Sequence, residues 1–131
     1  MINIKNAQFT NVKNHVKDIC PDCNTIEQNT PTVFPSLLFR QMDNPSYKNS
    51  QDSDSKENHV RPMIQIDIYT ANNNMYQAEQ IMNKADEQMQ TDGWERTFGP
   101  QPIKTSSTYA QLTARYQGIV RQNAPNDFTV I

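Results

Sequence analysis

The chain has 131 residues, of which 35% are hydrophobic, and its formal net charge is −2 at pH 7. This is the length of one compact domain, and we expect a single domain over residues 1–131, because two domains would each have too small a core. The acidic balance argues against the concentrated lysines and arginines that nucleic-acid binding needs, so no sequence-specific nucleic-acid partner is expected.

No targeting segment is predicted. Residues 1–5 lack the apolar run of a signal peptide, and no stretch approaches the roughly 20 apolar residues of a membrane helix. We therefore expect a protein that is assembled in a cytoplasm, without a membrane partner.

Charge is uneven along the chain. Residues 43–92 carry nine acidic and four basic side chains, whereas residues 93–131 carry two acidic and four basic ones. Opposite ends could attract each other in a head-to-tail ring, although a solvated surface is the simpler interpretation.

The first predicted element is a short amphipathic helix. Thr10 is its candidate N-cap, Pro21 ends the segment, and apolar residues lie between them at helical spacing: Val12, Val16 and Ile19. Residues 32–41 then mix β-branched, aromatic and aliphatic side chains, which predicts a strand. Pro35 cannot donate a ladder hydrogen bond, which favours an edge strand or a bulge near the start.

A polar loop, a strand and a helix follow. Residues 43–59 carry one aromatic and no aliphatic side chain, which predicts a loop that is flexible in the isolated protein. Isoleucines at every second position then predict a strand with one apolar face: Ile64, Ile66 and Ile68. Asn72 to Asn74 are N-cap candidates and Gly93 is a C-cap candidate for a helix with an apolar stripe of Met75, Ala78, Ile81, Met82, Ala85 and Met89.

The C-terminal third is predicted to be β-structure. Residues 94–98 form a short strand before a Gly-Pro-Gln-Pro corner, and residues 103–107 resume it. Alternating residues from Ala110 to Arg121 predict a further strand, in which Gly118 indicates a bulge. Residues 122–131 are expected as an extended tail that can add to a neighbour's sheet edge.

These elements predict an α+β fold in the order helix, strand, strand, helix, strand, strand. Neighbouring strands are joined as in hairpins, so an antiparallel or mixed sheet covered on one side by the methionine-striped helix is expected.

Cys20 and Cys23 have the spacing of a redox or metal pair. A reactive thiolate of the thioredoxin type lies at a helix N-terminus, whereas Cys20 follows a helix, where the dipole disfavours a thiolate. A zinc site would need two more ligands, and the histidines are His15 and His59. We expect unremarkable cysteines, with zinc binding or redox switching as the alternatives.

No motif predicts catalysis. The three glycines are isolated, so no phosphate-binding loop is possible, and no serine or histidine lies in a nucleophile motif. We therefore expect no enzyme, no cofactor and no metal. Trp94 with Arg96, and Tyr116, are of types that are enriched at interface centres, although each aromatic can equally belong to the core beside a surface charge. The full set of interface candidates is Arg40, Tyr47, Lys48, Arg61, Trp94, Arg96, Arg115, Arg121 and Phe128.

Several segments together resemble the tail terminator family of long-tailed bacteriophages, which includes tail completion, head-to-tail joining and minor capsid proteins. The similar segments are residues 34–41 (FPSLLFRQ), residues 62–69 (PMIQIDIY), the second helix, residues 93–100 (GWERTFGP) and residues 109–120. The likeness lies in element order and strand character. The Cys-Pro-Asp-Cys element and Pro35 depart from the family's pattern.

The resemblance implies a four-stranded, mainly antiparallel sheet with helices on one face, in a structural virion protein at the head-proximal end of the tail. Such a protein caps the tail tube as a hexameric ring, stops tube polymerisation and offers a joining surface for the head. The implied partners are copies of itself, the tail tube protein and a head connector or head completion protein. The alternatives are another head-to-tail connector or head completion protein and, in a different class, a small Cys20/Cys23 metal-binding or redox protein.

Overall fold

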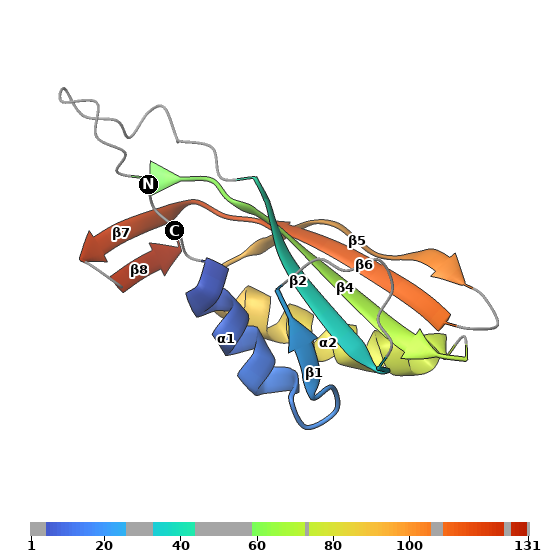
Figure 1. The fold of residues 1–131 in the computed structure, drawn as a ribbon. Coiled ribbons are helices and arrows are strands. Elements are labelled where there is room, and N and C mark those ends of the chain that lie inside the picture. The colour runs from blue at the N-terminus through green and yellow to red at the C-terminus, as the bar shows by residue number, and fades with distance from the viewer. Residues whose placement is uncertain are drawn as a thin grey trace.

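The protein is described by a computed structural model that covers residues 5–25, 33–43, 59–72, 74–105, 109–124 and 127–130. Along these ranges the elements follow one another in the order α1 (Lys5–Val16), β1 (Asp22–Asn24), β2 (Ser36–Asp43), β3 (His59–Val60), β4 (Met63–Ala71), α2 (Met75–Thr91), β5 (Glu95–Thr105), β6 (Tyr109–Gln117), β7 (Val120–Ala124) and β8 (Asp127–Val130). Figure 1 shows both helices on the same side of a twisted sheet. Residues 44–58 of the expected loop lie outside the described residues.

The main sheet has five strands in the order β1-β2-β4-β6-β5, and a second sheet has three in the order β3-β7-β8. The β1–β2 pair is parallel and the other pairs are antiparallel. The expected four-stranded, mainly antiparallel sheet is therefore wrong. The sequence misses β1 because three residues are too few to show a period of two, although Cys23 lies directly opposite Leu37 in the ladder.

The additional strand also corrects the position of β2. Pro35 favoured an edge strand, but β2 begins after this proline and lies between β1 and β4. The first helix begins at Lys5, well before the expected cap at Thr10, and it ends at Val16. A short turn follows, in which the amide of Cys20 donates to the carbonyl of Val16 at 2.8 Å.

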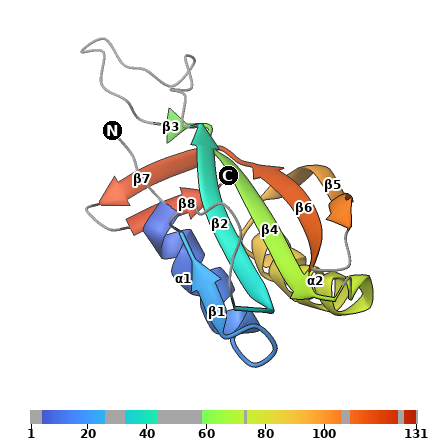
Figure 2. The same cartoon turned by 45° about the vertical axis from the view of Figure 1, so that its right-hand side comes forward.

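The hydrophobic core fills the space between the sheet and the two helices. The β4 isoleucines are fully buried on this face, and so is the predicted stripe of α2 with the exception of the partly buried Met75. Both elements are confirmed as the alternation and the helical spacing predicted them. Each fully buried isoleucine or methionine among them contributes about 1.5–3 kcal/mol to folding, so this layer is the main source of stability. Figure 2 shows α1 and α2 side by side under the sheet.

The C-terminal half differs more from expectation. Residues 95–105 form one long strand, β5, with several register shifts against β6. Gly99 sits at one of these irregularities with φ +77°, where an added Cβ would collide with the carbonyl oxygen of Thr113. After β6 the chain passes Gly118 and turns into β7, which pairs with β8. Much of the expected tail at residues 122–131 therefore pairs within its own chain.

A polar clamp ties α2 to the sheet from within the core layer. The buried Tyr116 hydroxyl donates to Asp86 Oδ1 at 2.6 Å, and Arg96 Nη1 lies 3.1 Å from the same oxygen. Burial, together with the hydrogen bond to Asp86, raises the pKa of Tyr116 well above its ordinary range.

No helix in the described part of the chain combines the length and apolar character needed to cross a membrane.

Replacing Tyr116 by Phe removes this hydrogen bond. We expect the free energy of unfolding near neutral pH to fall by about 1.5–3 kcal/mol, because the bond has a charged acceptor. The raised pKa of Tyr116 stabilises the wild-type fold below about pH 10, where unfolded tyrosine ionises, and this stabilisation is lost as the pH rises further. The difference between the two proteins should therefore shrink between about pH 7 and about pH 11. Urea denaturation at both pH values measures it, and a constant difference would contradict the assignment.

Candidate functional site

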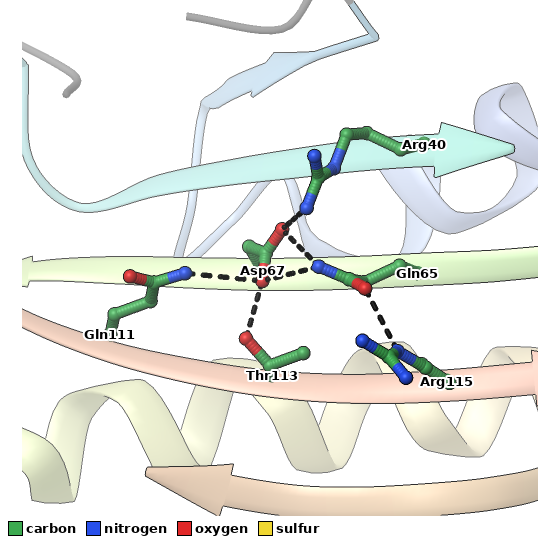
Figure 3. Close-up of polar contacts among 6 residues, drawn as sticks. All are labelled: Arg40, Gln65, Asp67, Gln111, Thr113 and Arg115. Carbon is green, nitrogen blue, oxygen red and sulfur yellow. Dashed lines mark hydrogen bonds and ion pairs between the residues drawn. The ribbon is translucent and has the colours of Figure 1, made fainter. Parts of the chain in front are cut away.

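The face of the main sheet that carries no helix holds a buried carboxylate, Asp67, near the middle of β4 (Figure 3). Its position follows from the strand's period of two. Ile66 and Ile68 point into the core under the helices, so Asp67 points to the opposite face with Gln65. The side chain of Asp67 is nevertheless fully buried, because its neighbours on β2 and β6 surround it.

Four side chains donate to the Asp67 carboxylate, and we call the resulting group of six residues the Asp67 cluster: Arg40, Gln65, Asp67, Gln111, Thr113 and Arg115. Arg40 Nη2 lies 3.1 Å from Oδ2. Gln65 Nε2 lies 3.1 Å from Oδ2 and 3.2 Å from Oδ1, and Gln111 Nε2 lies 3.4 Å from Oδ1. The Thr113 hydroxyl donates to Oδ1 as well.

These contacts decide what Asp67 can do. An ionised carboxylate has about four acceptor sites, and the donors of the cluster occupy them, so none is left to take a proton from a substrate. The ion pair with Arg40, whose side chain is 23% exposed, balances the buried charge. Asp67 therefore fixes its neighbours in place rather than acting as a general base.

Arg115 extends the cluster toward β5. Its Nε donates to Gln65 Oε1 at 2.9 Å, and its guanidinium lies 5.1 Å from the centre of the Phe98 ring. Phe98 is 38% exposed, so the arginine and the ring together form a fixed cationic and aromatic spot on this face. At the far end of the same face, the Tyr109 ring stacks on Phe34 at 6.3 Å.

The predicted interface residues are not all brought together. Arg40 and Arg115 meet in the Asp67 cluster, whereas Arg96 binds Asp86 beside α2 and Trp94 is buried in the core. The remaining candidates are placed elsewhere: Arg61 lines a hollow beside Gly93 and Gly118, Arg121 is exposed on β7, the backbone of Phe128 belongs to β8, and Tyr47 and Lys48 lie outside the described residues.

Sequence reasoning missed Asp67, Gln65, Gln111 and Thr113. The signal that could have found them is an aspartate at the centre of a strand whose alternate positions are isoleucines. A central strand leaves little room for solvent, so an acidic residue there requires a cationic partner on a neighbouring strand.

Cys20 and Cys23 lie together in the core, where Cys20 is fully buried and Cys23 nearly so. Both are free thiols. The hydrogen bond between the two side chains lowers the pKa of Cys23 and, together with burial, raises that of Cys20. Cys23 Sγ also lies 3.2 Å from the Cys20 carbonyl oxygen. Within the described ranges, no group of three or more histidine, cysteine, aspartate and glutamate side chains could hold a metal ion.

Comparison with known proteins adds no relative. No protein-family model matches this sequence, and a search of curated proteins finds no match.

The Asp67 cluster makes a stability prediction. Asp67→Asn replaces one carboxylate oxygen by an amide group, which is a donor and would face the donors of Gln65 and Thr113. The same change removes the negative charge that pairs with Arg40. We expect the free energy of unfolding to fall by about 3–5 kcal/mol, as when one partner of a buried ion pair is removed. Urea denaturation measures it, with Asp18→Asn, an exposed aspartate on the helix side, as the matched control. Equal free energies of unfolding for the two variants would show that the Asp67 cluster does not stabilise the helix-free side of the sheet.

Proposed function

We propose that this chain is a structural virion protein, a tail terminator that caps the phage tail tube as a hexameric ring. In this role it stops tube polymerisation and provides the joining surface for the head connector or head completion protein. Its place is then the head-proximal end of the tail, after assembly in the bacterial host cytoplasm.

The observation that carries the proposal is the helix-free face of the sheet. Asp67 is fully buried there and its carboxylate is occupied by donors, so its neighbours, among them Arg40 and Gln65, are held in fixed positions on a charged face. Arginine and aromatic side chains that are fixed before binding lose little entropy on association, which suits a protein interface. The segments that resemble tail terminators also fall on coherent elements, namely β2, β4, α2, β5 and β6.

The proposal is tested by the mass of the purified chain and by its binding to tail tubes. Six copies of a 15.1 kDa chain give a ring of about 90 kDa, which light scattering separates from a monomer. We expect this mass either in solution or on tubes of the matching tail protein, and electron microscopy should locate the rings at one tube end. A chain that stays monomeric at high concentration and does not bind the tubes would contradict the proposal.

The same experiment separates another connector role. A head completion protein would bind the head connector in the absence of tubes, whereas a tail terminator is expected to stop the growth of tubes when it is added during their polymerisation. Tube length distributions with and without the chain therefore discriminate the two roles.

A thiol-based role is the second candidate, and one observation favours it: Cys20 and Cys23 lie together in the core, with Cys23 Sγ 3.2 Å from the Cys20 carbonyl oxygen, and the neighbouring Cys20 side chain lowers the pKa of Cys23. The burial of both side chains opposes access by a partner. A Cys20→Ser, Cys23→Ser double variant with unchanged assembly, and no zinc by elemental analysis, would exclude this role.

A further inference from the structure

Arg115 is an arginine held in place with its charge uncompensated. Gln65 occupies Nε and Phe98 covers one face of the guanidinium, so the two terminal nitrogens remain for another partner. No carboxylate in the part of the chain that the structure describes forms an ion pair with Arg115. The cluster around it holds two guanidinium groups and one carboxylate, and Asp67 already pairs with Arg40. A planar guanidinium fixed in this way suits a carboxylate, which it can bind through two parallel hydrogen bonds.

A complementary spot lies on the outer side of α2. Glu79 is exposed, and no described residue pairs with its carboxylate. Tyr76, one helical turn earlier on the same side, is 71% exposed, more than any other large hydrophobic residue of the described ranges. The helix thus presents an anion beside an aromatic ring, and the sheet presents a cation beside an aromatic ring.

The two spots cannot meet within one molecule. Arg115 lies opposite Gln65 in the β4–β6 ladder, and its neighbour Tyr116 contacts Asp86 of α2. Glu79 precedes Asp86 by seven helix residues, about 10 Å at 1.5 Å per residue. The spots also lie on opposite faces of the two-layer structure, because α2 covers the face that the Asp67 cluster does not use.

We propose that Arg115 and Phe98 of one copy bind Glu79 and Tyr76 of the next copy. This inference rests on the proposed ring function and names the contact that would build the ring. The contact joins two different surfaces, the Arg115 side of one copy and the Glu79 side of the next. A growing chain of copies therefore keeps one unbound surface of each kind at its ends. These two ends meet only if the rotation between neighbouring copies completes a closed ring.

Strand addition along the β5 edge of the main sheet is a competing way to join copies, and the sequence of this strand opposes it. Pro100 and Pro102 lack amide hydrogens, and register shifts interrupt the strand around them. A contact between side chains on the two faces does not depend on this edge.

The test uses two charge reversals in the full chain, Arg115→Glu and Glu79→Arg. Each variant alone brings like charges together at every contact, and we expect association at least about 30-fold weaker, the effect of about 2 kcal/mol. An equimolar mixture of the two variants should assemble again, because every contact between unlike copies then joins opposite charges. Lys17→Glu is the matched control, since it makes the same charge change at an exposed lysine of the helix layer.

Urea denaturation first establishes that each variant is folded. Sedimentation velocity of each variant, of the mixture and of the control then gives the result, and electron microscopy of tail tubes incubated with the same samples gives it if the wild-type chain forms rings only on tubes. Glu79→Arg changes an exposed helix residue, so it keeps the test decisive if Arg115→Glu is unstable: its failure to weaken association would alone overturn the inference. Variants that weaken association but do not reassemble when mixed would also overturn it. If the wild-type chain still forms rings, either of these results overturns only the contact and leaves the proposed function intact. If the wild-type chain forms no rings on tubes, both the function and the contact are overturned.

Discussion

A buried negative charge on the side of a sheet without helices is the constraint on which the rest of this structure depends. Asp67 is removed from water without help from the hydrophobic core, which lies on the other side of β4. The charge is tolerated because donors from β2, β4 and β6 converge on it, and each of them is thereby fixed. The cluster therefore sets both the alignment of the three central strands and the direction in which Arg115 points.

The helix layer uses the same kind of contact with a different purpose. Asp86 accepts a hydrogen bond from the Tyr116 hydroxyl and pairs with Arg96. Asp92 Oδ2 accepts hydrogen bonds from Gln8 Nε2 at 2.8 Å and from Gln88 Nε2 at 2.9 Å. The first carboxylate joins α2 to the sheet, and the second joins α2 to α1. These bonds select one arrangement of helices whose apolar contacts alone would tolerate small shifts, because hydrophobic burial has no preferred direction.

The sequence predicted the elements whose pattern is long enough to repeat. Ile64 to Ile68 and the methionine stripe of α2 identify a strand and a helix without reference to the rest of the chain. The strand at Cys23, the single long β5 and the hairpin of β7 and β8 escape such reasoning, because their partners decide them rather than their own periodicity. The Asp67 cluster escapes it for a similar reason. Arg40, Gln65 and Thr113 are ordinary strand residues until the register of three strands places them around one carboxylate.

Gly118 links the two sheets, and its small size has a mechanical consequence. A Cβ at this position would lie 3.0 Å from Val130 and 3.2 Å from the Trp94 ring, so the C-terminal hairpin packs closely on a residue of the core. Only two residues separate the end of β6 from the start of β7. The second sheet is therefore joined to the main sheet by a short, closely packed connection, so a displacement of β8 at Val130 would also move the tryptophan that precedes β5.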